Sequence, residues 1–296
     1  MKLENSVKTV FLICVMTGLF ILVGNVIGGR AGVFLALVLS LGFNFGMYWF
    51  SDKIVLRMHR AQPIGPGDPY GVFQMVQELS VRAGLPMPSV YMIPQALPNA
   101  FATGRDPAHA AVAVTEGICR LLSPRELRGV LSHELSHIRN RDTLISTIVA
   151  GIASAIMQLA NMARWAMIFA GGRSSDDRDG PNPLAMLLVI IVAPIAAILI
   201  QLYISRTREF QADASGAEIS GDPEALASAL EKISNPSLLQ SIARAGAMPR
   251  TSPALTHMYI VNNLSGQSFL SIFSTHPSTG ERVRRLRGLL GTGYGR

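Results

Sequence analysis

The sequence predicts a mostly α-helical protein with a small β-sheet, in which a soluble domain is joined to a bundle of about four transmembrane helices. Only 15% of the 296 residues are charged, against about 25% in soluble domains. The hydrophobic residues, 49% of the chain, gather in four long apolar runs, at 7–27, 32–50, 143–170 and 184–204. The segments between and after these runs carry turn signals, short strand patterns and helix caps, which are typical of a folded soluble domain.

Residues 1–60 are predicted to form an N-terminal transmembrane hairpin. The run at 7–27 spans about 20 residues, which exceeds the ~7–15 residues of a signal-peptide core, and no Ala-x-Ala-like cleavage site follows it. A turn at 28–30 leads into the second run, at 32–50. The turn holds one arginine, whereas three basic residues follow the second run: Lys53, Arg57 and Arg60. Both ends of the hairpin are therefore expected on the cytoplasmic side.

Residues 61–142 are predicted to be the first part of the soluble domain. A helix is expected over 70–84, because its apolar residues recur at helical spacing and Gly84 can end it. Strands are expected at three places, of which the middle one is an edge strand: 89–93, 98–104 and 110–115.

The helix predicted after these strands carries the candidate metal ligands and the candidate general base. Ser123 and Glu126 can form a capping box around Pro124, which suits the first helical position. Further along this helix stands His-Glu-Leu-Ser-His at 133–137, the pattern H-E-x-x-H. His133 and His137 share one helix face and can bind a single zinc ion, while Glu134 can reach a metal-bound water. Zinc lowers the pKa of such a water to about 7, and the glutamate can accept its proton as general base.

A catalytic zinc needs a third protein ligand, for which the best candidate is Glu209. Asp213 lies four residues later on the same face of a predicted helix, so it can orient a ligand histidine. His137 precedes the third apolar run and Glu209 follows the fourth, so packing of these two runs would bring both residues to one bilayer surface. Three other glutamates stay open as alternatives on spacing alone: Glu218, Glu224 and Glu231.

Residues 143–204 are predicted to be two further transmembrane helices, and residues 205–296 the second part of the soluble domain. The run at 143–170 is rich in Ala, Ser, Met and Gly, which suits close helix packing in a bilayer. The loop between the two runs holds three aspartates and two arginines and is expected outside, which leaves both metal-binding segments on the cytoplasmic side. A basic cluster at 282–287 is interpreted as the solvated face of a C-terminal helix.

Four motifs, taken in order, make the chain resemble the HtpX-type membrane zinc metalloproteases, a bacterial family related to the CAAX prenyl endoprotease. They are P-N-A-F-A-T-G at 98–104, H-E-L-S-H-I-R-N-R-D at 133–142, R-E-F-Q-A-D at 208–213 and T-H-P at 275–277. The resemblance covers essentially the whole chain and implies a gluzincin-like catalytic domain. It implies one zinc ion per chain, bound by three ligands: His133, His137 and Glu209. It also implies that Glu134 is the general base and that Asp213 contacts a ligand histidine without binding the zinc itself.

The resemblance also implies roles for residues without a local signature. Substrate is expected to pair with the edge strand at Asn99, Ala100 and Phe101, and His276 and Arg282 are expected to support catalysis. The resemblance implies that the chain crosses the bacterial inner membrane several times, with its catalytic domain on the cytoplasmic side. The implied role is the cleavage of misfolded or damaged membrane proteins in the stress response and quality control of the envelope, so the partners are membrane or unfolded proteins and the lipid bilayer.

Two other functions compete with this interpretation. A processing protease for one peptide or lipidated substrate would carry the same zinc site, and substrate choice depends on cavity shape. A non-catalytic membrane scaffold or transporter with an incidental metal site would hold ionisable groups at mid-membrane, whereas the only one inside the last three runs is Arg164, near the end of its run. Nucleic acid is not an expected partner despite a net charge of +7, because the basic residues largely border apolar runs.

Overall fold

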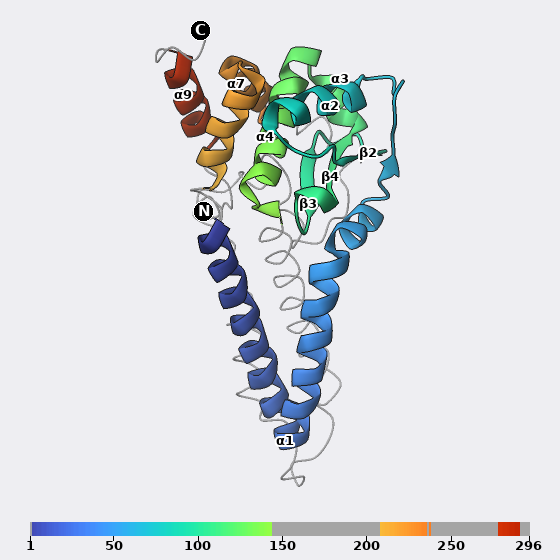
Figure 1. Cartoon of the computed structure of the whole chain (residues 1–296), viewed down its shortest axis with the longest axis vertical. Helices are drawn as coiled ribbons and strands as arrows, with labels where there is room; N and C mark the ends of the chain where they lie inside the picture. The colour runs from blue at the N-terminus through green and yellow to red at the C-terminus, as the bar shows by residue number, and fades with distance from the viewer. Residues whose placement is uncertain (1, 144–207, 236, 238–277, 291–296) are drawn as a thin grey trace.

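The computed structural model describes residues 2–143, 208–235, 237 and 278–290. Within them, a small mixed sheet and its covering helices stand above a long bent helix (Figure 1). The elements, in chain order, are α1 (Lys2–Met58), β1 (Gln62–Pro63), α2 (Val72–Ala83), β2 (Ser89–Ile93), β3 (Ala100–Gly104), a 3-10 turn (Pro107–His109), β4 (Ala110–Thr115), α3 (Glu116–Leu121), α4 (Pro124–Asn140), a helical segment over 208–220, α7 (Pro223–Ile233) and α9 (Thr279–Leu290).

Helix α1 is sharply bent, and Figure 1 shows its two arms diverging from the bend. Gly29 has a φ of 54°, in the left-handed region that favours glycine, and it lies within the turn predicted at 28–30. Gly24 and Gly32 face each other across the bend, because a Cβ atom built on either would collide with the backbone of the other. The predicted hairpin is thus present as two helical arms of one continuous helix.

None of the helices in the described part of the chain has the length and apolar character that crossing a membrane requires. The crossings predicted at 7–27 and 32–50 stay predictions. The predicted runs at 143–170 and 184–204 lie outside the described residues, apart from Thr143.

The sheet has the strand order β1-β2-β4-β3, which leaves β3 at an edge as predicted. Strand β4 pairs in parallel with β2 and antiparallel with β3, where Ala102 lies opposite Val112. The predicted strands at 89–93 and 110–115 are confirmed, and the predicted edge strand is shorter than expected, because regular pairing begins at Ala100.

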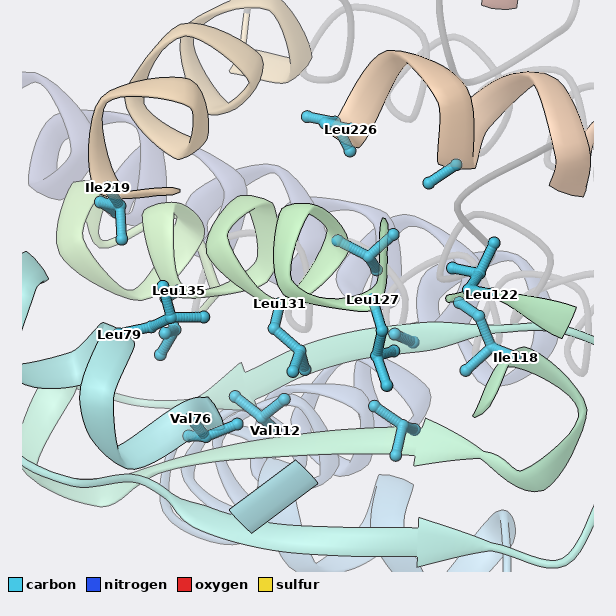
Figure 2. Packing of buried hydrophobic residues seen from close by; sticks show 14 of the residues in the cluster. Val76, Leu79, Val112, Ile118, Leu122, Leu127, Leu131, Leu135, Ile219 and Leu226 are labelled. Atoms are coloured by element: carbon cyan, nitrogen blue, oxygen red, sulfur yellow. The ribbon is translucent and has the colours of Figure 1, made fainter. Parts of the chain in front are cut away.

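The two faces of the sheet are covered by different parts of the chain. On one face, Leu131 and Leu135 of α4 pack with Val76 of α2 and Val112 of β4 in the main core, as Figure 2 shows. On the other face, the C-terminal end of α1 packs against a smaller cluster that includes Phe101 and Ala113. The sheet therefore joins the helix that carries the H-E-x-x-H motif to the end of the bent helix.

The start of α4 is fixed by the predicted capping box. The Ser123 side chain accepts from the backbone N–H of Glu126, and the Glu126 carboxylate accepts from the backbone N–H of Ser123. The same carboxylate accepts hydrogen bonds from Ser228 and Lys232 of α7, at 2.6 and 2.7 Å. Glu126 thus both caps α4 and attaches it to α7.

We expect Glu126→Gln to lower the free energy of unfolding at pH 7 by about 1.5–3 kcal/mol, a range usual for hydrogen bonds to a charged group. Burial by itself would raise the pKa of Glu126, but the bonds from Lys232, Ser228 and Ser123 lower it to about 2 from 4.5. A lowered folded-state pKa means that the stabilisation is complete above pH 4.5 and is lost as the pH falls toward 2. Denaturant unfolding of the wild type and of Glu126→Gln measures the difference in their free energies of unfolding. A difference that does not shrink at acidic pH would contradict the prediction.

Candidate active site

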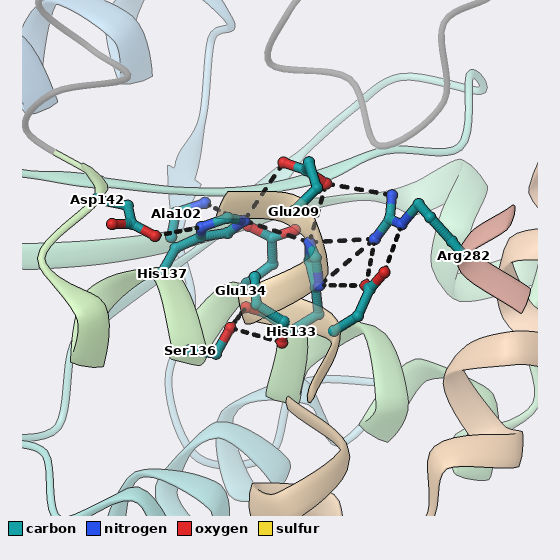
Figure 3. Close-up of polar contacts among 10 residues, drawn as sticks. Ala102, His133, Glu134, Ser136, His137, Asp142, Glu209 and Arg282 are labelled. Carbon is teal, nitrogen blue, oxygen red and sulfur yellow. Dashed lines mark hydrogen bonds and ion pairs between the residues drawn. The ribbon is translucent and has the colours of Figure 1, made fainter. Parts of the chain in front are cut away.

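Three potential metal ligands converge from two helices (Figure 3). His133 and His137 lie one turn apart on α4, and their Nε2 atoms are 3.3 Å apart. The carboxylate of Glu209, on the helical segment 208–220, lies 3.6 Å from Nε2 of His133 and 3.8 Å from Nε2 of His137. One atom of each residue lies within 4.8 Å of the other two, so the three can hold one metal ion.

The three alternative glutamates lie elsewhere, each in an ion pair with an arginine. Glu218 binds Arg139 at 2.7 Å. Glu224 and Glu231 both bind Arg287 of α9, each at 2.9 Å. Of the four glutamates that the sequence left open, the structure brings only Glu209 to the two histidines.

The donor set of this cluster fits a catalytic metal. Two imidazole nitrogens and one carboxylate oxygen form the His₂Glu set of catalytic zinc sites, which leave a fourth position open for water or substrate. Electrostatics favour a cation as well. Burial would lower the pKa of His137, but its contact with Asp142 and the charges of Glu209 and Glu134 raise it to about 9. The surroundings of this imidazole therefore stabilise positive charge.

A buried ion pair holds His133. Its Nδ1 atom lies 3.0 Å from Oδ1 of Asp213. Arg282 of α9 donates two hydrogen bonds to the Asp213 carboxylate, at 2.9 and 2.6 Å, and its Nη1 atom lies 3.3 Å from Glu209. Burial would raise the pKa of Asp213, but Arg282 and His133 lower it, so the carboxylate stays ionised.

The interpretation of residues 282–287 as a solvated face is wrong for Arg282. Its exposed fraction is 1%, although the side chain of Arg284, two positions later, is 76% exposed. The buried guanidinium is tolerated because it bonds the Asp213 carboxylate directly and lies beside that of Glu209. The structure thus places Arg282 in the site, where the resemblance implied it, and attaches α9 to the metal cluster.

Asp142 is a site residue that the sequence reasoning missed. Its Oδ2 atom lies 3.3 Å from Nδ1 of His137, and its exposed fraction is 3%. Partial burial lowers the pKa of the neighbouring Arg208, whereas the charges of Asp142 and Glu209 act in the opposite direction. A spacing of five residues from His137 does not share a helix face, so helical periodicity gave no signal for Asp142.

Glu134 lies between the metal cluster and the edge strand. Its Oε2 atom accepts a hydrogen bond of 2.9 Å from the backbone N–H of Ala102. Burial raises the pKa of Glu134, and the charges of His133 and His137 oppose that shift. A buried carboxylate with a raised pKa beside a metal cluster suits a general base.

The edge strand presents only alternate residues outward. The carbonyl of Asn99 accepts from the N–H of Thr115, so the backbone groups of Asn99 and Phe101 point toward β4. Those of Ala100 and Ala102 point to the open edge, in agreement with the bond from Ala102 to Glu134. The Phe101 side chain packs on the far face of the sheet, with its ring 5.2 Å from that of His59. Of the predicted trio, Ala100 is thus the residue whose backbone faces outward, and His276 lies outside the described residues.

The helical segment 208–220 approaches α4 closely at Gly216. A Cβ atom there would lie 2.9 Å from the Cα and 3.0 Å from the backbone nitrogen of His133. The Ser136 hydroxyl bridges the two helices, because it lies within hydrogen-bonding distance of the carbonyls of His133 and Ala212, at 2.6 and 3.0 Å. This close approach sets the distance from Glu209 to the histidines.

We expect Gly216→Ala to lower the free energy of unfolding by about 1–3 kcal/mol, as overpacking does, and to weaken metal binding. The added methyl group would collide with the backbone of His133, so the helical segment that also carries Glu209 has to shift relative to α4. The matched control is Gly288→Ala on α9, where a Cβ meets nothing within 4 Å. Denaturant unfolding and metal titration of both variants measure the effects. Alanine ordinarily stabilises a helix relative to glycine by about 1 kcal/mol, so a stabilised Gly216→Ala protein would contradict the packing.

Comparison with known proteins shows which proteins this chain is similar to. The sequence matches Peptidase family M48 over residues 71–290. A protein named Protease HtpX homolog from Desulfatibacillum aliphaticivorans is 53% identical over 286 residues, which cover 96% of this chain and 89% of that relative. One of the same name from Ralstonia pickettii is 54% identical over 289 residues, 98% of each chain. The crystal structure of S. mikatae Ste24p is similar with a TM-score of 0.53 at 18% identity, over 96% of this chain and 66% of that one, and this likeness shows a shared fold.

Proposed function

This chain belongs to Peptidase family M48 and is a metallopeptidase, and we propose that it is an integral-membrane zinc endopeptidase that cleaves misfolded or damaged membrane proteins. The observation that carries the proposal is the convergence of His133, His137 and Glu209 around one point, with Glu134 beside them at the edge of the sheet. A donor set of two histidines and a glutamate favours zinc.

The residues of the site have distinct roles in hydrolysis. His133, His137 and Glu209 would hold the zinc ion, which would supply Lewis-acid chemistry for the hydrolysis of a peptide bond. Glu134 takes the proton from the attacking water and passes it to the leaving amine. Asp213 fixes the orientation of His133, and Arg282 holds Asp213 and Glu209 in place. The role of His276 in supporting catalysis stays a prediction.

Substrate binds as an added strand along β3. The edge strand, over Asn99, Ala100 and Phe101, offers the outward backbone groups of Ala100 and the outward carbonyl of Ala102 to an extended peptide. Because Glu134 already touches the N–H of Ala102, a peptide paired there passes beside the general base. Main-chain pairing tolerates many sequences, which suits an enzyme that degrades damaged proteins.

We place the protein in the bacterial inner membrane, with the catalytic parts, 61–142 and 205–296, on the cytoplasmic side. The support is the apolar character of residues 1–60 and 143–204 and the basic residues that follow the second run. Large apolar side chains on the second arm of α1 are exposed, as lipid contact requires: Phe34, Leu35, Leu39, Leu41 and Phe45. The relatives bear the name of HtpX, which favours a role in quality control of the envelope.

Cleavage of an unfolded reporter protein by the detergent-purified, zinc-loaded full chain tests the proposal. We expect a chelator to reduce cleavage to background and added zinc to restore it, because the activity depends on the metal. Cleavage that withstands the chelator would contradict a metal mechanism. Cleavage of a single lipidated or short peptide, with the reporter left intact, would instead assign the chain to dedicated processing.

A further inference from the structure

Each of the two histidines of the metal cluster contacts a buried carboxylate through its Nδ1 atom. For His133 the partner is Asp213, at 3.0 Å, and for His137 it is Asp142, at 3.3 Å. Both aspartates are buried, each with an exposed fraction of 3%. Metal-binding histidines in proteins commonly donate their second ring N–H to such a carboxylate, which fixes the tautomer and the ring orientation. The structure therefore repeats at His137 the arrangement expected at His133.

The end of helix α4 delivers Asp142 to this position. Arg141 ends the helix in the left-handed conformation, with a φ of 60°, which is uncommon for a residue other than glycine. The chain then folds back, and the backbone N–H of Asp142 donates to the carbonyl of His137 at 2.9 Å. This reversal turns the Asp142 side chain onto the last turn of the helix, where His137 lies.

The turn is also fixed to the edge strand. Thr143, which is 4% exposed, donates from its hydroxyl to the carbonyl of Gly104 at 2.9 Å. The turn over 141–143 is thus attached both to α4 and to the end of β3. The Asp142 carboxylate is held between fixed elements, so it can hold an imidazole in a single orientation.

We propose that Asp142 is a positioning residue of the metal site, whose carboxylate accepts the Nδ1–H of His137 and directs Nε2 toward the metal. The proposal rests on the zinc site described under the proposed function. The bond that ends the helix comes from the Asp142 backbone, so the turn itself does not require the carboxylate and survives a change of side chain. Removal of the carboxylate should therefore affect the metal more than the fold.

The test is the zinc dissociation constant of the full-length protein, measured by competition with a chromophoric chelator. We expect Asp142→Ala to bind zinc about 10- to 100-fold more weakly than the wild type, the loss usual for such carboxylates. Asp142→Asn keeps a neutral acceptor and should lie between the two. The visible absorption of the cobalt-substituted variants should shift as well, because the imidazole is no longer held in one orientation.

Asp106→Ala is the matched control. Asp106 also contacts a histidine, with its Oδ1 atom 2.8 Å from Nδ1 of His109, but that pair is exposed and neither residue belongs to the metal cluster. The zinc affinity of the Asp106→Ala variant should equal that of the wild type. The melting temperature of each metal-free variant separates a loss of fold from a loss of positioning.

Weaker zinc binding by Asp142→Ala and Asp142→Asn, with metal-free melting close to the wild type, supports the proposal. Zinc affinities within about twofold of the wild type, or two variants that do not fold, overturn it and assign Asp142 to stability. A wild-type protein that binds no zinc would instead overturn the proposed function, so the two failures are distinguishable.

Discussion

Glu134→Gln is expected to remove nearly all peptidase activity and to leave zinc binding intact. The amide keeps the size of the side chain and can still meet the N–H of Ala102 through its oxygen, but it cannot accept a proton from water. General acid–base catalysis contributes about 10²- to 10⁴-fold to the rate, so kcat should fall by that factor. Reporter cleavage and zinc content, measured on the same preparation, check both halves of the prediction.

Glu218→Gln is the matched control for this experiment. Glu218 lies on the same helical segment as Glu209, but its carboxylate is exposed and paired with Arg139. An exposed pair of this kind contributes about 0–1 kcal/mol to stability, and the variant should cleave the reporter as the wild type does. Equal cleavage by Glu134→Gln and the wild type would show that another group takes the proton.

Arg282→Ala is expected to have the largest effect on stability. Removing one partner of a buried ion pair typically costs about 3–5 kcal/mol, because the other charge is left without compensation. Here Asp213 loses two hydrogen bonds and Glu209 loses a neighbouring positive charge. We expect denaturant unfolding to show that loss, and zinc titration to show weaker binding because both carboxylates are then free to move.

Arg284→Ala shares the helix and the residue type, and it serves as the control. The Arg284 side chain is 76% exposed and pairs with Glu281 on the surface of α9, so the free energy of unfolding should change by less than about 0.5 kcal/mol. If Arg282→Ala were as mild as Arg284→Ala, the buried network around Asp213 would not exist in solution.

The site is assembled from segments far apart in the chain. Helix α4 supplies two ligands and the base, the segment 208–220 supplies Glu209 and Asp213, and α9 supplies the arginine that holds them. The edge strand β3 adds the N–H that meets Glu134. A change in the position of any one element therefore alters the geometry of the metal cluster.

Features with a local cause could be predicted from the sequence. The start of α4 follows from Ser123, Pro124 and Glu126, whose capping bonds lie within one turn. The strands at 89–93 and 110–115 and the stop of α2 at Gly84 follow from composition and backbone preference. His133 and His137 share a face because a helix repeats every 3.6 residues. Each of these features depends on neighbours within a few positions, which the sequence displays directly.

Other features depended on tertiary packing. Glu209 and Glu218 are both glutamates on one helical segment, and only the contact of that segment with α4 at Gly216 decides which of them meets the histidines. Arg282 and Arg284 look alike in the sequence, yet one is buried in the site and the other is exposed, because α9 turns a single face to the metal cluster.

The place of Asp142 in the site and the outward groups of the edge strand also depended on tertiary structure. The pairing register of β3 with β4 decides that Ala100 and Ala102, and not Phe101, present backbone groups outward. The left-handed turn at Arg141 brings Asp142 back onto His137. Local spacing thus determined which residue types could do the chemistry, whereas burial and register, which involve partners distant in the chain, decided which of them lie in the site.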